Sequence, residues 1–132
     1  MIKEIGEFIE DKTLFDVGVD LFVGHRPQDA PDRCQVLLER SGGVVYFDLR
    51  DRIDLVIQVL SRADTYFNAR DDAYTIFNTI HGTAGWTLPT ITSGESYKAM
   101  TIEAQAAPQY IGQDDKGRYE FSTNYIFRCQ DA

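Results

Sequence analysis

The sequence is poor in the residue types from which catalytic and metal sites are most often built. Its 132 residues include two histidines, two cysteines and one tryptophan. His25 and His81 are each isolated, and neither has a Cys or a second His at the ligand spacing typical of zinc. There is no glycine-rich phosphate loop ending in Gly-Lys-Ser/Thr and no Gly-x-Ser-x-Gly nucleophile motif. We therefore expect no cofactor, no metal and no enzymatic activity.

The sequence contains two aspartate pairs, and paired carboxylates can serve acid–base chemistry or hold Ca²⁺. Asp29 with Asp32, and Asp114 with Asp115, do not have the spacing of an EF-hand loop. Aspartates in turns usually cap the backbone or carry solvated charge, which is the role we expect here. His81, which precedes a glycine, is expected at a helix C-terminus, where a cation is favoured.

Basic residues are also scarce. Thirteen Lys and Arg against 21 Asp and Glu give a net charge of −8. Phosphate binding depends on Lys and Arg, so we expect DNA only as a non-specific passenger near an acidic surface.

No apolar run approaches the roughly 20 residues that span a bilayer. Residues 1–5 have no apolar segment typical of a signal peptide, so we expect assembly in a cytoplasm.

The two cysteines, Cys34 and Cys129, form no CxxC pair. Their number allows one disulfide, but a reducing compartment favours buried free thiols, and both fall at expected core-facing strand positions.

What the chain does contain is enough apolar material for one domain, residues 1–132, with 43% hydrophobic and 12% aromatic residues. Apolar residues at helical spacing predict a helix over 2–12, and a short strand follows at 21–23. Residues 25–32 hold two prolines and predict an ordered surface loop.

The middle of the chain predicts strands. Alternation of Cys34, Val36 and Leu38 with polar neighbours indicates a half-buried strand. Residues 41–43 are expected to turn, and 44–49 to be extended without an identifiable partner. A charged stretch, 50–54, leads into a central strand over 53–60, which is apolar on both faces.

A long helix is expected over 63–80, with Gly82 near its C-terminal cap. Its polar side is predicted to hold Asn68, Asp71, Asp72, Thr75, Asn78 and Thr79, and its apolar side Tyr66, Phe67, Ala69, Ala73, Tyr74, Ile76, Phe77 and Ile80. Arg70 projects into the apolar side. Two readings stay open: a side chain whose stem covers aromatic surface, or a buried or interface ion pair or cation–π contact with a tyrosine.

Residues 86–89 predict a loop over one end of the core. A β-hairpin from about Tyr97 to Cys129 closes the domain. In its first strand Met100, Ile102 and Ala104 share a face, and in its second Tyr119, Phe121, Thr123, Tyr125 and Phe127 do so. Residues 113–117 form the polar turn between them. The expected fold class is α+β, with a mainly antiparallel sheet of four to five strands and two amphipathic helices packed on one face.

The C-terminal part also carries a family pattern. A proline-containing segment, Ala106-Ala107-Pro108-Gln109-Tyr110-Ile111-Gly112, leads into the turn and then into the aromatic strand Phe121-Ser122-Thr123-Asn124-Tyr125. Leu21-Phe22-Val23-Gly24 before a polar loop, and Gln58-Val59-Leu60-Ser61-Arg62-Ala63 before an aromatic helix, add to it. With these stretches the chain resembles the phage tail-terminator, or minor capsid (tail-completion), proteins of long-tailed phages.

The resemblance implies a non-enzymatic virion protein at the tail–neck junction, assembled in the host cytoplasm. Such proteins form a ring, typically a hexamer, that caps the tail tube, stops its polymerisation and joins it to the neck. The implied partners are further copies of the chain, the tail tube protein and a head-completion or neck protein, with no membrane.

Each subunit of a closed ring presents two different complementary faces. Loops and turns are our candidates for these faces, and the acidic surplus is a candidate lining of the lumen. The residues are Arg26, Asp29, Asp32, Arg50, Asp51, Arg52, Asp54, Arg70, Gln113, Asp114, Asp115 and Lys116. Three alternatives remain: another head–tail neck or connector protein, a non-phage ligand-binding α+β domain, and a nucleic-acid-binding module.

Overall fold

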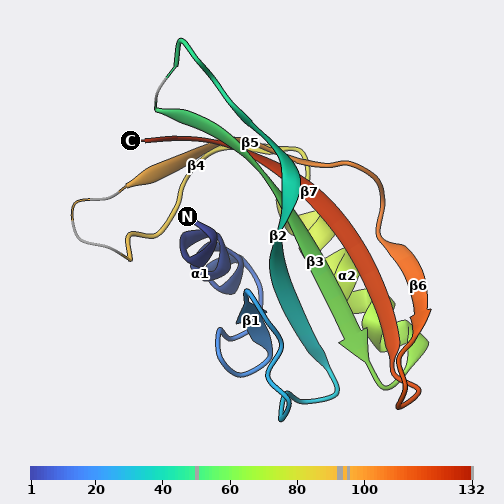
Figure 1. The fold of residues 1–132 in the computed structure, drawn as a ribbon. Coiled ribbons are helices and arrows are strands. Elements are labelled where there is room, and N and C mark those ends of the chain that lie inside the picture. Colours follow the sequence, from blue (N-terminus) through green and yellow to red (C-terminus); the bar gives the residue numbers. More distant parts are fainter. Residues whose placement is uncertain (50, 92–93, 95, 132) are drawn as a thin grey trace.

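A computed structural model describes residues 1–49, 51–91, 94 and 96–131 of the chain. Two helices and seven strands follow one another along it (Figure 1). Their order is α1 (Ile2–Lys12), β1 (Leu21–Val23), β2 (Cys34–Val45), β3 (Arg52–Ala63), α2 (Tyr66–Ile80), β4 (Thr83–Thr87), β5 (Tyr97–Ala104), β6 (Gln109–Gln113) and β7 (Tyr119–Asp131). None of the helices in these residues has the length and apolar character needed to cross a membrane.

The strands form one curled, mixed sheet in the order β1-β2-β3-β7-β5-β4. β6 pairs with β7 outside this path. β1 runs parallel to β2, and the other pairs are antiparallel. The expected sheet of four to five strands, mainly antiparallel, is therefore wrong. Short strands such as β4 and β6 carry little periodicity, so the sequence pattern did not distinguish them from loops.

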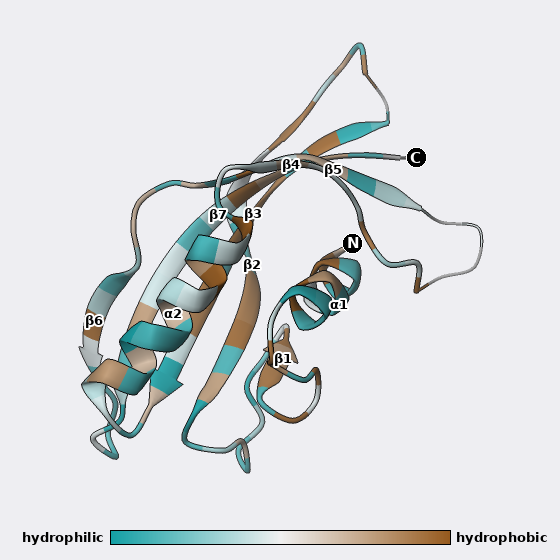
Figure 2. Cartoon of the chain, turned by 180° about the vertical axis from the view of Figure 1, so that it is seen from behind, coloured by the Kyte–Doolittle hydropathy of each residue, from teal (hydrophilic) through white to brown (hydrophobic). Residues whose placement is uncertain are grey.

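Both helices pack on the same face of the sheet. Register places Leu37 opposite Val59, and the odd-numbered residues of β3 and β7 face α2. Ile5 and Ile9 of α1 join the same core as Ile76 and Ile80 of α2, which lies across β3 and β7 in Figure 2. α1 approaches β1 closely because Gly6 has no side chain: a Cβ there would lie 2.7 Å from Cγ2 of Val23.

The ends of α2 follow from local chemistry. β3 continues to Ala63, so the helix begins at Tyr66 and not at Ala63 as expected. Thr65 is its N-cap, and the Thr65 hydroxyl accepts a hydrogen bond from the Asn68 amide at 3.2 Å. His81 is the C-cap, and Gly82 follows with a positive φ of 75°, as its position predicted.

The expected turn at 41–43 is wrong, because β2 continues through it to Val45. A bulge lies between Arg40 and Val44, and Gly42 takes a φ of 104° within it. Gly43 passes so close to β3 that a Cβ would collide with the carbonyl oxygen of Asp54. The glycine pair thus marks a bulge within a strand that continues to Val45.

β4 also departs from the expectation of a loop at 86–89. Trp86 lies in this strand and pairs with Ala99 of β5. Its ring lies 5.6 Å from that of Phe8, and the Lys12 ammonium lies 4.2 Å from the Trp86 ring centre. The residue therefore covers one end of the core, as expected, but from a strand.

The C-terminal hairpin forms with its first arm divided in two. β5 pairs with residues 125–131 of β7, and β6 pairs with residues 119–122 along the same edge. The turn at 113–117 is confirmed by hydrogen bonds between Asp114 and both Gly117 and Arg118. A register shift between Ala99 and Thr101 buries Ala99 in place of Met100, whereas the expected face of β7 is confirmed.

Cys34 and Cys129 are both buried free thiols, as expected. Register places them on opposite faces of the sheet, since Cys34 pairs with Arg62 and Cys129 with Ile53. Cys129 therefore faces the helices, whereas Cys34 is buried on the other face, so both occupy buried strand positions as expected. Burial raises the pKa of both thiols, that of Cys129 to about 12.

Candidate assembly surfaces

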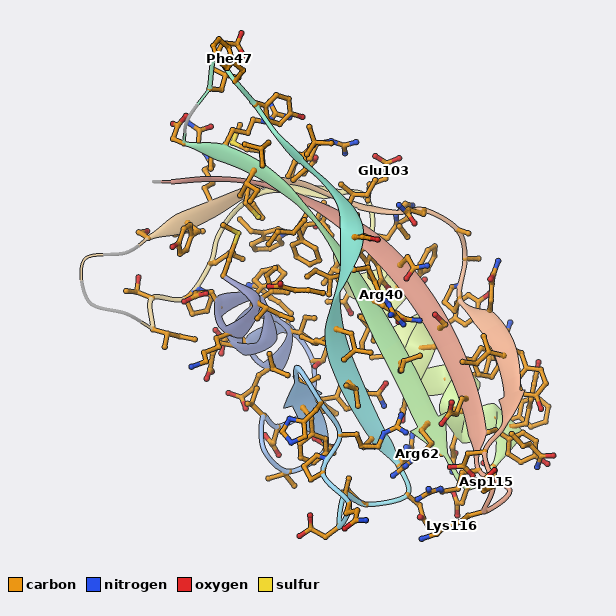
Figure 3. The ribbon with its side chains drawn as sticks, in the orientation of Figure 1. Arg40, Phe47, Arg62, Glu103, Asp115 and Lys116 are labelled. Carbon is orange, nitrogen blue, oxygen red and sulfur yellow. The ribbon has the colours of Figure 1, made fainter. Side chains whose placement is uncertain are left out.

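The predicted contact segments gather at two opposite ends of the sheet. In Figure 3, Arg62, Asp115 and Lys116 lie at one end, and Phe47 lies at the other. The first end, called the loop end here, consists of the loop 25–32 and the turn 113–117. The second, called the finger, is the tip of the β2–β3 hairpin, residues 44–49.

At the loop end, Arg118 joins the two predicted segments. Its Nη1 lies 3.1 Å from an oxygen of Asp32, and its Nε lies 2.7 Å from an oxygen of Asp114. Arg26 reaches Glu120 of β7, with Nη1 3.4 Å from Oε1. Asp32 and Arg118 are 86 residues apart in the chain, and through them the loop and the turn form one charged surface.

Arg62 of β3 attaches the loop 25–32 to the sheet. This side chain is only 3% exposed, and it donates to the backbone carbonyls of Pro31 at 2.8 Å and Asp32 at 3.1 Å. Burial lowers the pKa of the Arg62 guanidinium, and the positive charge of Arg26 adds to this effect. Sequence reasoning missed Arg62. The available signal was a basic residue just after the apolar strand expected over 53–60.

Two neighbouring aspartates at the turn have different roles. Asp114 accepts hydrogen bonds from the amides of Lys116, at 3.0 Å, and Arg118, at 2.9 Å. Partial desolvation would raise the pKa of Asp114, but these hydrogen bonds and the Arg118 guanidinium outweigh it and lower the pKa. Asp115 and Lys116 are exposed, and their side chains form no ion pair with the described residues. Asp114 thus holds the turn, and its two neighbours are available to a partner.

The finger is braced at its base by Asp54. The Tyr46 hydroxyl donates to this carboxylate at 2.7 Å, and Nε atoms of Arg52 and Arg128 each lie 3.8 Å from its oxygens. The Arg52 guanidinium also lies 4.7 Å from the ring centre of Tyr46. Asp54 is buried. Within the predicted charged segment 50–54, this residue therefore has a structural role.

The tip of the finger is apolar and exposed. Phe47 is 101% exposed, and Val44, Val45 and Leu49 are exposed beside it. A monomeric surface rarely presents neighbouring large apolar side chains without a partner. The sequence pointed to the charges of this segment and missed its apolar tip, although Val44-Val45-Tyr46-Phe47 was the available signal.

Three further predicted residues lie in the charged segment 50–54 or on α2. Asp51 accepts a hydrogen bond from Gln130 at 3.0 Å. Arg50 lies outside the described residues. Arg70 is exposed, and its guanidinium lies 4.4 Å from the ring centre of Tyr74, which confirms the cation–π reading and excludes burial.

A second exposed apolar surface lies where α2 begins. Tyr66 contacts the rings of Phe67, Tyr110, Tyr119 and Phe121, with centroid distances from 5.3 to 6.1 Å. Phe67 and Tyr110 are exposed. The expected apolar side of the helix is therefore wrong for Phe67, which faces solvent beside β6.

The histidines are held by structural contacts or lie on the surface. Nδ1 of His81 accepts the Ala104 amide at 2.9 Å, and its ring stacks on Phe77 with centroids 4.7 Å apart. His25 is exposed. Over residues 1–49, 51–91, 94 and 96–131, no three His, Cys, Asp or Glu side chains gather as metal ligands would.

Comparison with known families identifies the family of the chain. A family model described as bacteriophage tail terminator protein matches residues 8–131. The chain belongs to this family. The match spans every strand and both candidate surfaces, so it confirms the resemblance that the C-terminal pattern indicated. No curated protein sequence matches the chain.

Membership makes this tail terminator family protein a virion component that contacts other tail or head proteins. The family is structural and not enzymatic.

Proposed function

We propose that the protein forms a closed ring, typically a hexamer, on the end of the tail tube. There it stops polymerisation of the tube and joins the tail to the neck of the head. The observation that carries the proposal is the family match over residues 8–131. The proposed position in the virion is the tail–neck junction, with assembly in the host cytoplasm.

The two ends of the sheet support a ring. A ring closes by heterologous contacts, in which one surface of a subunit binds a different surface of the next. The finger is apolar, whereas the loop end is charged, with Arg118, Asp32 and Asp114 linked to one another. One chain thus offers two chemically different surfaces, and the edges of β1 and β4 lie between them.

The net charge of −8 supports a passage for DNA and not a binding site for it. An acidic lumen repels phosphate, so a genome moves through it without being held. We place the exposed Asp115 of the turn on the lumen side as part of this proposal.

An elongation assay tests the proposal. Tail tube protein is polymerised with and without the chain, and tube lengths are measured by negative-stain electron microscopy. We expect growth to stop and one end of each tube to carry added density, whereas an unrelated acidic protein of similar size leaves lengths unchanged. Continued elongation with the chain unbound would contradict the proposal and favour another neck or connector protein.

A further inference from the structure

A cavity lies between α1 and β1, far from the finger. Its volume is about 320 Å³, and its walls include Val17, Phe22 and Val23 with Ile91 at one side. The rim includes Lys3 and Glu7 of α1. Pockets of roughly 300 Å³ and above hold small ligands, so this one has ample room for a single aromatic ring.

The finger carries an exposed aromatic side chain that suits this apolar cavity. Phe47 is fully exposed, and Figure 3 shows it at the tip of a hairpin that projects beyond the rest of the sheet. α1 and β1 lie well below this tip in both Figure 1 and Figure 2, so a chain does not fill its own cavity. From these observations we infer that Phe47 of one subunit inserts into the α1–β1 cavity of the next subunit in the ring.

The charges beside the two surfaces are complementary. Asp48 follows Phe47 and is exposed, and Lys3 is exposed on the cavity rim. Neither side chain forms a salt bridge within the described part of the chain. Glu7, one helical turn further along α1, is an anion on the same rim. Asp48 therefore approaches from the Lys3 side, which fixes the orientation of the finger in the cavity.

Such a contact is heterologous, since an apolar knob binds a pocket on a different surface. Repetition of one heterologous contact closes a ring when the rotation allows it. The inference rests on the proposed ring and specifies which surfaces form it. It assigns the partner of the finger to a second copy of this chain and not to the tail tube.

The first test compares substitutions at two apolar residues of similarly high exposure. Phe47→Ser removes the knob, and Leu14→Ser removes a side chain that is 96% exposed on another surface. Both proteins are added to tail tubes, and bound subunits are measured by sedimentation over a range of concentrations. We expect the midpoint for Phe47→Ser to rise roughly ten- to a hundredfold, as loss of one buried phenyl group predicts, and that for Leu14→Ser to stay unchanged.

The second test identifies the occupant of the cavity. Asp48→Lys and Lys3→Asp should each weaken assembly, and the double charge swap should restore it. A Phe47→Cys, Ile91→Cys chain on tubes treated with a mild thiol oxidant should give a ladder of disulfide-linked oligomers, since Cys34 and Cys129 are buried. Leu14→Cys with Ile91→Cys is the matched control and should give no ladder.

The outcomes separate this inference from the proposed function. If the unaltered chain caps tubes while Phe47→Ser binds as Leu14→Ser does, the inference is overturned and the proposed function stands. Loss of binding in Phe47→Ser without a ladder or a charge-swap rescue would assign the finger to the tail tube, which also overturns it. If the unaltered chain neither binds nor caps tubes, both fall together.

Discussion

Arg33 and Asp72 form a bidentate ion pair that joins the start of β2 to the middle of α2. Nε of Arg33 lies 2.8 Å from Oδ2 of Asp72, and Nη2 lies 2.8 Å from Oδ1. Gln35 donates to the same carboxylate at 3.1 Å. Asp72 is 4% exposed, whereas the Arg33 side chain is 51% exposed, so the carboxylate is the member that depends on the pair.

Asp72→Asn should lower the free energy of unfolding by about 1–2 kcal/mol, because a buried group loses its charge-assisted hydrogen bonds. The exposure of Arg33 keeps the effect below that of a fully buried pair. Urea denaturation followed by circular dichroism measures it. Asp71→Asn, on the exposed neighbour, is the matched control, and equal midpoints for the two variants would show that the pair contributes nothing.

Asp72 also illustrates what helical periodicity does not reveal. Helical periodicity predicts that Asp72 lies on the polar side of α2. In the structure it is buried and paired with Arg33. A buried carboxylate is acceptable only where a partner is supplied, and that partner lies 39 residues away in the chain. The sequence predicted α1, the central place of β3, the turn at 113–117 and the alternation of β7, since each depends on local pattern. Pairings between distant segments were not accessible in this way.

The same contrast holds for the candidate surfaces: features set by local sequence were predicted, and contacts between distant segments were not. The polar loop 25–32 and the turn 113–117 were identified from proline, glycine and aspartate, which act locally. Their meeting through Arg118 and their attachment through Arg62 depend on the register of β3 and β7. The sequence predicts a turn at Gly42 and Gly43, where the structure has a bulge, because glycine serves in both.

Arg62→Met should release the loop 25–32 from the sheet, since the two carbonyls of residues 31 and 32 lose their donor. The amide of Ala30, which donates to Pro27, should exchange its hydrogen about tenfold faster. Exchange measured by mass spectrometry provides the check. Arg40→Met, an exposed arginine on the same face of the sheet, is the control, and equal rates in both variants would rule out the anchor.

Stability should fall as the pH rises above about 9, because the folded chain retains protons that the unfolded chain releases. Burial raises the pKa of Cys129 to about 12 and also raises the pKa values of Cys34 and Tyr125. An unfolded thiol titrates near 8.5, so between these values the native state binds more protons and the free energy of unfolding decreases.

Cys129→Ala should reduce this pH dependence by up to about 1.4 kcal/mol per pH unit, the contribution of one proton. Urea denaturation at pH 8, 9 and 10 gives the slope for each protein. Loss of the buried thiol also changes stability independently of pH, so the slope and not the absolute value is compared. Identical slopes would exclude Cys129 as a source of the alkaline loss.

Asp115→Lys should slow ejection of DNA if the turn at 113–117 faces the lumen, because an added ammonium retains phosphate. Asp114 is unsuitable for this test, since its substitution removes the hydrogen bonds that hold the turn. Asp11→Lys makes the same change of charge on the exposed side of α1 and is the control. Ejection from purified virions, timed by a DNA-binding dye, would be unchanged in both variants if the turn lies outside the lumen.

The most direct test of the proposed function is the position of the protein in the virion, measured by cryo-electron microscopy of intact particles. The account predicts a closed ring of this fold, seven strands and two helices in each subunit, between the last layer of the tail tube and the neck. Density of this fold elsewhere in the particle, or its absence from the end of the tube, would contradict it.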